Sequence, residues 1–431
     1  MLKTALKARM MIKFYFKRSC STYLRSVFIA VLVCHFLCQY HKVHAQDPHG
    51  SPYNSFGIGD MYNRGFGITD MLGNAAIGYK SSEAVNLKNP ASLTGITGYS
   101  HIFDMGLEYN KAVFRSDNEM AQLDYGNLAH LNLWFRLSKK WSSSFGIRPF
   151  SNMDYNITES ISAPNIGSYN ANYQGSGGLN EIYWAHGLQL FKNLSIGVNA
   201  GFVFGKAQRT ETGFNIPNVG LVASQRTELF RKGTIDFGTQ YSFDIGASNF
   251  TLGATWRPEV NMTTSFEEVL MANSVDSITT EGYSSFKLPQ NIGFGISWQR
   301  GRTLLTADLE KTYWSINEAG ENYEYNDIIS FAVGLERRAD FQSNSFLDYI
   351  TYRTGFSINK RYISINNTSF NELRWTAGMS IPVKRNTSKI NLGYSYTFRG
   401  TTENDLVQEN YHTVTLGISM KKLWFQRSYY R

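Results

Sequence analysis

The chain has 431 residues, of which 42 are Lys or Arg and 34 are Asp or Glu, giving a formal net charge of +8. Eight of the bases and none of the acids lie in residues 1–45, so the remainder is balanced at 34 of each sign and offers no electrostatic argument for binding nucleic acid. All three cysteines, Cys20, Cys34 and Cys38, also lie there, which excludes a disulfide framework, a Cys₄ zinc site and a thiol nucleophile from residues 46–431.

Residues 1–45 are typical of an export signal. A basic region precedes an apolar stretch from Val27 to Cys38, and Val43-His44-Ala45 loosely fits the small-x-small rule for cleavage. The apolar stretch is shorter than the roughly 18–20 residues of a membrane-spanning helix, which argues against the alternative of an N-terminal anchor. We therefore expect a signal peptide at residues 1–45 and an exported chain that begins at Gln46.

The next segment, residues 46–97, is dense in glycine and other small residues and contains no long strand pattern. Its most compact stretches are Gly73-Asn74-Ala75-Ala76-Ile77 and Asn89-Pro90-Ala91. Small residues permit close backbone packing and turns with positive φ. A segment of this size is suited to fill the lumen of a barrel of about fourteen strands, which would otherwise leak. We expect it to form a hatch.

From residue 98 onward the sequence repeats a strand pattern of about ten residues. In residues 389–398, Ile390, Leu392 and Tyr394 share one face with Tyr396 and Phe398, and polar residues or glycine occupy the other. Such strands suit an all-β, transmembrane antiparallel β-barrel; the alternative, a soluble β-sandwich, would rarely need so many of them. The fourteen expected strands are centred near 99–113, 126–137, 142–157, 173–190, 193–208, 226–243, 249–262, 280–299, 303–314, 328–338, 350–359, 373–382, 389–398 and 411–425.

The connections between these strands alternate in length. Those after even-numbered strands are mostly short, although 339–349 is longer than the pattern requires. Outer-membrane barrels have short periplasmic turns and long external loops. We therefore expect a barrel at residues 98–425 in the outer membrane of a Gram-negative cell, both termini in the periplasm, and a basic periplasmic tail at 426–431. The expected external loops are 114–125, 158–172, 209–225, 263–279, 315–327, 360–372 and 399–410.

If the apolar strand faces meet lipid, the opposite faces point a mixed set of charges into the lumen. One interpretation is a salt-bridged lumen that braces the hatch, and the other is a polar substrate path. The balanced signs favour the first. The expected inward residues are Asp104, Glu108, Arg136, Arg148, Asp236, Arg257, Asp308, Glu310, Glu336, Arg353 and Arg374.

Several motifs resemble the FadL/TodX outer-membrane transport family, in the divergent form typical of Bacteroidetes. They are the Gly-rich opening, residues 73–77, Asn89-Pro90-Ala91 just before the first strand, residues 173–179, and Trp424-Phe425. The resemblance implies a 14-stranded barrel, an N-terminal hatch inside it, and uptake of hydrophobic compounds. The chain departs from that family in two ways. It ends in a basic tail instead of a terminal aromatic residue, and the hydrophobic ligand pocket of the family cannot be matched to it residue by residue.

The same resemblance implies a lateral gap at a kinked third strand. Pro149 lies in the expected third strand and cannot donate to a ladder, so it would mark such an opening. The alternative is a bulge or strand end without a role in transport. The hatch residues that could gate passage, or could simply hold the plug, are Gly73, Asn74, Ala75, Ala76, Asn89, Pro90 and Ala91.

Neither an enzyme nor a cofactor is predicted. The histidines after residue 45 have no metal-ligand spacing, and the chain lacks a Gly-x-Ser-x-Gly elbow or a phosphate-binding loop. Glu181 and His186 could be imagined in a membrane hydrolase, but barrel-wall positions are the favoured interpretation.

The sequence therefore predicts passive passage of a small hydrophobic, fatty-acid-like molecule across the outer membrane. The alternative is a non-transporting accessory or scaffold barrel in an outer-membrane protein secretion or assembly complex, with aromatic loops such as 321–325 available to dock a partner. The expected partners are outer-membrane lipid, a hydrophobic small molecule or other outer-membrane proteins. Binding of nucleic acid is not expected.

Overall fold

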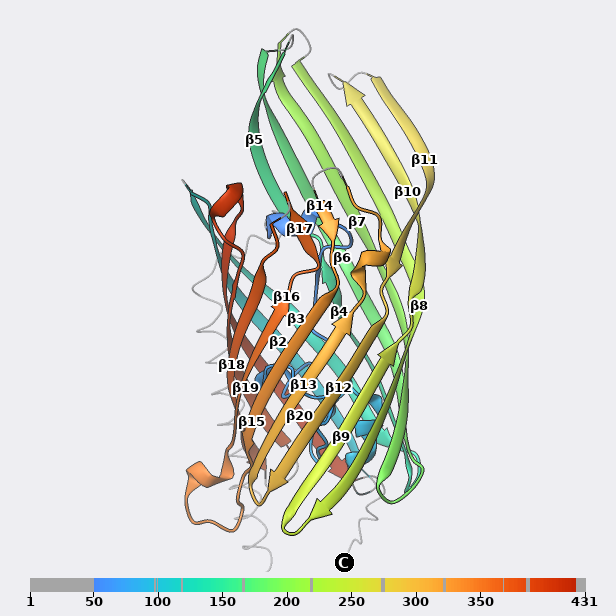
Figure 1. The fold of residues 1–431 in the computed structure, drawn as a ribbon, viewed down its shortest axis with the longest axis vertical. Coiled ribbons are helices and arrows are strands. Elements are labelled where there is room, and N and C mark those ends of the chain that lie inside the picture. Colours follow the sequence, from blue (N-terminus) through green and yellow to red (C-terminus); the bar gives the residue numbers. More distant parts are fainter. Residues whose placement is uncertain are drawn as a thin grey trace, which may run out of the picture. The chain divides into compact units, whose positions relative to one another are not determined.

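The computed structural model describes residues 50–423 except for positions 97, 99, 118, 165–166, 218–219, 273–275, 321–322, 367 and 385–387. This part of the chain forms an all-β fold, a closed antiparallel barrel with fourteen strands in its wall (Figure 1), which confirms the predicted fold class. None of its helices is long and apolar enough to cross a membrane. The expected signal peptide, Trp424-Phe425 and the expected tail lie outside the described residues.

The elements follow one another around the barrel in chain order. The strands are β1 (Asp60–Met61), β2 (Ser100–Arg115), β3 (Met120–Arg136), β4 (Trp141–Asn152), β5 (Tyr155–Ala163), β6 (Gly167–Gln189), β7 (Leu194–Ile216), β8 (Gly220–Ile245), β9 (Ser248–Arg257), β10 (Val260–Ala272), β11 (Asp276–Leu288), β12 (Asn291–Arg300), β13 (Thr303–Thr312), β14 (Tyr323–Tyr325), β15 (Ile328–Arg337), β16 (Thr351–Lys360), β17 (Ile363–Ile365), β18 (Asn371–Lys384), β19 (Ser388–Arg399) and β20 (Gln408–Leu423). The short 3₁₀ helices are η1 (Pro52–Ser55), η2 (Asp70–Leu72), η3 (Pro90–Gly95), η4 (Trp314–Ile316), η5 (Phe346–Tyr349) and η6 (Glu403–Asp405).

Three wall strands are each broken into two elements: β4 and β5, β9 and β10, and β11 and β12. Pro258 and Pro289 lie in the second and third breaks, where the missing proline N–H ends the ladder. The wall closes because β2 pairs with both β3 and β20, with Ser100 opposite Leu423. The first and last wall strands therefore meet at the same rim.

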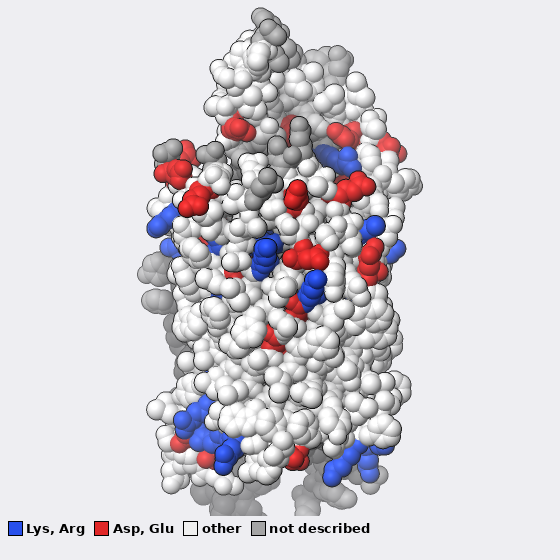
Figure 2. Space-filling view, viewed as in Figure 1, with Lys and Arg blue, Asp and Glu red and all other residues white. Residues whose placement is uncertain are grey.

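Side chains alternate across the wall as the sequence predicts. On β19, Asn391, Gly393 and Ser395 are buried in the lumen, whereas Leu392 and Tyr394 are exposed on the outside. Figure 2 shows a zone without charged residues between the lower rim and the charged upper part of one face. The exposed apolar side chains of the barrel wall include Phe294, Ile296, Leu305, Leu309, Phe331, Leu335, Phe356 and Trp375. This apolar outer surface suits contact with lipid tails.

One side of the barrel rises well beyond the rest (Figure 1). We call this extension the wing and define it as the described residues within 155–175, 209–229 and 260–288, which belong to β5, β10, β11 and the parts of β6, β7 and β8 that pair with them. Its hairpins replace most of three expected loops, 158–172, 209–225 and 263–279, so the loop assignment there was wrong. Cross-strand contacts stabilise the extra strand residues: Ser160 donates to Asn170 at 2.8 Å, and the Arg226 guanidinium lies 3.9 Å from the Phe266 ring centre.

Two breaks in the ladder separate the wing from the lower part of the wall. On one side, the pairing of β3 with β4 ends at Leu131 and Ile147, so that β5 pairs only with β6. On the other side, β11 pairs only with β10, whereas β12 below it pairs with β9 and β13. Within the described residues, the wing is therefore a sheet with two free edges, β5 and β11.

Candidate functional site

The lumen contains the chain's own N-terminal segment, residues 50–96, which we call the lumen segment. It begins beside the base of the wing, where Asn54 Nδ2 donates to the Asp154 carbonyl at 2.9 Å. It ends near the opposite rim, where Arg136 donates to the Ile96 carbonyl at 3.0 Å. Gly50 and Leu423 thus lie toward opposite ends of the barrel, and the expectation that both termini are periplasmic stays a prediction, because residues 1–49 are outside the described part.

The first predicted motif forms a tight turn after η2. Gly73 (φ 64°) and Asn74 (φ 64°) both adopt the left-handed conformation that glycine and asparagine tolerate best. The Gly73 N–H donates to Thr376 Oγ1 at 2.9 Å, and Asn74 Oδ1 accepts from the Gly65 N–H at 3.0 Å. Ala75 and Ala76, which follow, are completely buried.

The second predicted motif, Asn89-Pro90-Ala91, starts η3 and ties it to the wall. Asn89 Oδ1 accepts from the Ala91 N–H at 3.1 Å, which is an N-cap, and Pro90 occupies the first helical position, where its missing N–H is not needed. Asn89 Nδ2 also donates to the carbonyls of Ile77 (2.9 Å) and Thr239 (3.0 Å). One side chain therefore caps the turn, joins two parts of the lumen segment and binds strand β8.

The wall makes room for the lumen segment with inward-facing glycines, a pattern that the sequence reading missed. A Cβ on Gly355 would lie 2.1 Å from the Gly73 nitrogen, and one on Gly197 would lie 2.3 Å from the Ala91 nitrogen. No side chain fits at such distances, so the backbone of the segment packs directly on the strands. The sequence signal is a glycine at an inward position in each of eight wall strands. We call this set the glycine belt: Gly187, Gly197, Gly238, Gly253, Gly295, Gly334, Gly355 and Gly378.

Buried ion pairs hold the lumen segment at several points. Lys88, which is 2% exposed, lies between Asp308 (3.1 Å) and Glu310 (2.6 Å) of β13 and also donates to the Asn74 carbonyl. The Asp308 carboxylate in turn accepts from the backbone N–H of Ala76 at 2.6 Å. The pairing satisfies charges that would be expensive to bury alone.

Three further charged residues of the lumen segment are held in the same way. Asp70 receives two hydrogen bonds from the Arg374 guanidinium at 2.6 and 2.7 Å, a bidentate geometry. Asp60 is bound by Arg361 at 2.8 Å and by Arg399 at 2.6 Å. The third residue, Arg64, pairs with Asp236 of β8, which Arg257 also binds at 2.6 Å.

These pairs fix the charge states of the lumen segment. Burial by itself raises the pKa of Asp60, but the guanidinium groups of Arg361 and Arg399 outweigh it and hold that pKa well below its usual range. Burial lowers the pKa of Lys88, and the carboxylates of Glu310 and Asp308 outweigh it, so that this pKa lies above its ordinary value. Both groups stay charged at neutral pH.

Apolar layers seal the lumen above and below these ion pairs. The layer toward the wing contains Ile58, Phe150, Trp314, Tyr325 and Tyr362, with the Trp314 and Tyr362 rings stacked 4.3 Å apart. The layers toward the opposite rim are built around residues such as Leu72, Tyr79, Leu93 and Trp134. The lumen segment contributes to every layer, so the bore is filled at two levels.

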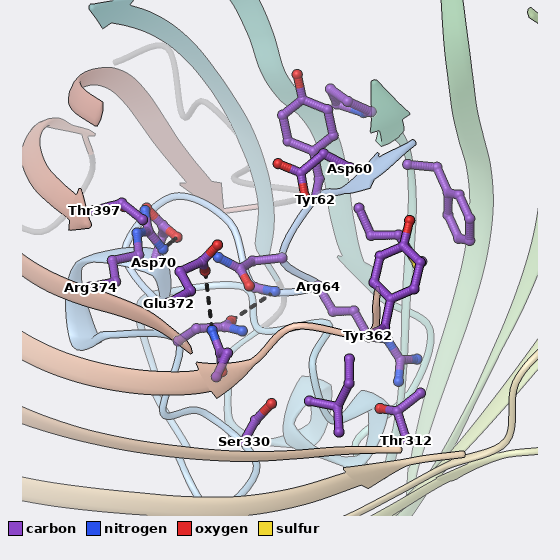
Figure 3. A pocket seen from close by; sticks show the side chains of 18 of the residues that line it. Asp60, Tyr62, Arg64, Asp70, Thr312, Ser330, Tyr362, Glu372, Arg374 and Thr397 are labelled. Carbon is purple, nitrogen blue, oxygen red and sulfur yellow. Dashed lines mark hydrogen bonds and ion pairs between the residues drawn. The ribbon is translucent and has the colours of Figure 1, made fainter. Parts of the chain in front are cut away.

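A polar cavity of about 330 Å³ remains between the layers (Figure 3). In Figure 3, Asp60, Tyr62, Arg64 and Asp70 of the lumen segment face wall residues such as Arg374. Half of its charged lining residues bind one another, and four more bind charged partners outside the lining. Ligand pockets for hydrophobic molecules are lined mainly by apolar and aromatic side chains with few polar groups, whereas this lining combines twelve charged residues with apolar ones such as Phe66, Phe150 and Trp314. The charged lining residues are Asp60, Arg64, Asp70, Glu108, Arg148, Arg257, Glu310, Lys360, Arg361, Glu372, Arg374 and Arg399.

Pro149 lies at the break in the wall between β3 and β4. The ladder to β3 ends two residues earlier at Ile147, and the register with β6 shifts between Pro149 and Ser151. The edge of β4 that β3 leaves free is taken by strand β1 of the lumen segment, with Met61 opposite Ser151. The hydrogen-bond ladder is therefore broken at the position where the family resemblance implied a lateral opening, and the lumen segment covers part of this break.

Four of the other expected inward residues, Asp104, Arg148, Glu336 and Arg353, behave as the bracing interpretation requires. Arg148 pairs with Glu181, Arg353 pairs with Glu336, and Asp104 lies 3.4 Å from the buried His130. Glu181 and His186 do not form one site, because Glu181 faces the lumen while His186 faces outward and accepts a hydrogen bond from Trp141 at 3.3 Å. Within the described ranges, no group of three His, Cys, Asp or Glu residues could hold a metal ion.

Comparisons with known proteins give a family and a fold. A family model described as BamG matches residues 26–431. No curated protein matches the sequence. The fold resembles the CymD monoaromatic hydrocarbon channel, at 12% identity and a TM-score of 0.54 over 88% of this chain and 100% of that chain.

Two other solved structures are similar. The Pseudomonas putida toluene transporter TodX shares 14% identity, with a TM-score of 0.56 over 86% of this chain and 100% of that one. A Pseudomonas aeruginosa FadL homologue shares 11% identity, with a TM-score of 0.56 over 85% and 99%. The predicted resemblance to the FadL/TodX family therefore holds for the fold, whereas the family model that matches is a different one.

Proposed function

Since this chain belongs to the BamG family and forms an outer-membrane β-barrel, we propose that it is a non-transporting accessory subunit that supports other proteins of an outer-membrane assembly complex. In this proposal residues 46–97 are a permanent hatch, residues 98–425 are the barrel and residues 426–431 are a periplasmic tail. The wing faces the exterior and the short turns face the periplasm, as in other outer-membrane barrels.

The observation that carries the proposal is the attachment of the lumen segment. To open a continuous path, the segment would have to leave the glycine belt and break the pairs of Lys88, Asp70 and Asp60. Leaving one partner of a buried ion pair uncompensated costs about 3–5 kcal/mol. Several such losses together exceed what a passively bound small molecule would supply, so a fixed plug is the better interpretation.

A second candidate function, passive passage of a small hydrophobic molecule, is favoured by the ladder break at Pro149. In that case ligand would pass between β3 and β4, and movement of strand β1 away from Ser151 would widen the gap. The gating residues would then be Gly73, Asn74, Ala75, Ala76, Asn89, Pro90 and Ala91. The many charged residues in the lining of the central cavity speak against a stable site for such a molecule.

Extraction of the protein from its own outer membrane in mild detergent, followed by native mass analysis, separates the two functions. The accessory function predicts a stoichiometric protein partner and no bound hydrophobic ligand. A lone barrel that carries fatty acid, and that speeds the entry of fatty acid into liposomes, would overturn it. Liposomes with an unrelated plugged barrel provide the control for leakage.

A further inference from the structure

Strand β11 of the wing leaves one side of its backbone unpaired. It pairs residue by residue with β10, from Leu288 opposite Val260 to Asp276 opposite Ala272. No strand among the described residues pairs with its other side. At the base of this side, the Asn317 side chain accepts from the Lys287 N–H (2.9 Å) and donates to the Lys287 carbonyl (2.9 Å).

That contact identifies which groups point to the free edge. Because Lys287 directs its N–H and C=O away from β10, every second residue above it must do the same. A side-chain amide occupies the first of these positions with the donor and acceptor that a neighbouring strand would supply. The residues that direct their backbone groups to the uncovered edge are Ser277, Thr279, Glu281, Tyr283 and Ser285.

This edge belongs to the wing, above the zone of the wall that carries no charged residues (Figures 1 and 2). Its exposed outward side chains include Glu281 and Lys287, and Tyr283 is 81% exposed. Unpaired backbone groups are tolerated there because water can reach them, whereas hydrocarbon would not allow them. Residues 277–286 contain no proline and one charge, so the edge has few of the features that usually prevent strand addition.

The outer face beside this edge also carries an unbalanced pair of acids. Glu267 of β10 stands directly opposite Glu281 of β11, and both side chains are exposed. No ion pair within the described residues joins either of them to a base. Like charges directly opposite one another destabilise a sheet, and a basic side chain on an adjoining strand would relieve the repulsion.

We propose that the free edge of β11 binds an extended segment of a partner protein as an added antiparallel or parallel strand, with a Lys or Arg placed beside Glu281. A segment of about nine residues, roughly 30 Å long, would cover the edge. This inference deepens the proposed accessory function and rests on it. A second copy of the chain is a poorer occupant, because a two-fold pairing centred on the edge would set Glu281 against itself.

Hydrogen exchange tests the inference directly. The partner-bound complex, extracted in mild detergent, is compared with the same barrel after the partner has been removed. We expect the amides of Thr279, Glu281 and Tyr283 to exchange at least about tenfold more slowly in the complex. A stoichiometric partner with unchanged exchange at these amides would overturn the edge proposal and leave the accessory function standing, whereas the absence of any partner would overturn both.

Two variants and a control test the chemistry of the edge. Tyr283→Pro removes one outward N–H, and Glu281→Lys reverses the charge; each should lower the fraction of barrel that retains the partner by about tenfold. Glu159→Lys, on the opposite free edge of the wing, makes the same charge change and should retain the partner. Equal retention by all three variants, or a Tyr283→Cys barrel that forms a disulfide dimer through this position, would contradict the proposal.

Discussion

The lumen and the wing of this barrel differ in whether their polar groups have partners within the chain. In the lumen, the charges of Lys88, Asp70 and Asp60 are paired, and the backbone of the lumen segment packs on the glycine belt. In the described part of the wing, no strand pairs with one edge of β11, and no base forms an ion pair with Glu267 or with Glu281 opposite it. The lumen segment is thus held by contacts within the chain, whereas in our proposal a partner strand pairs with the free edge of the wing.

This difference teaches where stability and recognition reside. Substitutions in the lumen remove contacts that the chain makes with itself, so they should lower the free energy of unfolding. Substitutions on the wing edge remove groups that the chain leaves unused, so they should change partner binding and leave unfolding almost untouched. A lumen variant that was harmless, or an edge variant that unfolded the barrel, would break the comparison.

The largest effect is expected for Lys88→Met, which keeps the size of the side chain but removes its charge. The carboxylates of Asp308 and Glu310 then lose the ammonium group that lies 3.1 and 2.6 Å from them. Loss of one partner from a buried ion pair costs about 3–5 kcal/mol. Denaturant unfolding of the refolded barrel, followed by tryptophan fluorescence, should show a loss of this size.

Lys80→Met provides the matched control for that measurement. Lys80 also belongs to the lumen segment, but its ammonium makes a single 3.4 Å contact with Ser195 and no ion pair in the described structure. We expect its removal to cost less than about 1 kcal/mol. Equal losses for the two lysine variants would show that the ion pairs do not hold the segment.

The barrel itself could be predicted because the period of two along a strand is a local signal. The pattern at 389–398 is confirmed by β19, and the fourteen expected strands correspond to the fourteen strands of the wall. The balanced inward charges predicted a braced lumen, and pairs such as Arg148 with Glu181 bear this out. Each of these expectations depended only on residues that are close in the sequence, or on the alternation of side chains between the two faces of a strand.

The partners of the lumen segment could not be predicted, because they join residues that are far apart in the sequence. No residue near Lys88 in the sequence indicates that it will form an ion pair with β13. Likewise, the sequence around Gly355 does not indicate that the backbone of Gly73 packs against it. The wing was missed for a different reason. Its strands are polar on both faces, so the alternation that marks a lipid-facing strand is weak there, and the hairpins were read as loops.

The next effect concerns the glycine belt. Gly355→Ala would place a methyl group 2.1 Å from the backbone nitrogen of Gly73, so the lumen segment must move away from β16. Overpacking of this kind costs about 1–3 kcal/mol. Gly233→Ala is the control, since its Cβ would meet nothing closer than 3.9 Å. Limited proteolysis of the folded barrels should detect a loosened segment in the first variant and not in the second.

A smaller effect is expected at Asn89, whose side chain both caps η3 and binds the wall. Asn89→Ala removes both contacts, whereas Asn89→Ser keeps a capping oxygen and loses the donation to Ile77 and Thr239. The alanine variant should therefore be less stable than the serine variant by about 1 kcal/mol, the usual contribution of an N-cap. Unfolding midpoints that do not differ would show that the cap contributes nothing here.

The smallest effect on stability is expected on the wing. Tyr283→Pro removes an N–H that points away from β10, and proline is tolerated on edge strands when its missing donor faces solvent. The Tyr283 side chain is 81% exposed and buries little surface. We expect the unfolding free energy to change by less than about 1 kcal/mol, as for most surface substitutions.

Thr280→Pro is the informative control, because the Thr280 N–H points toward β10, where Glu268 stands opposite. Only this control should make the amides of β10 exchange faster, since only it breaks the shared ladder. If Tyr283→Pro disturbed β10 equally, the free edge would be part of the fold, and the contrast between a self-sufficient lumen and an incomplete wing would fail.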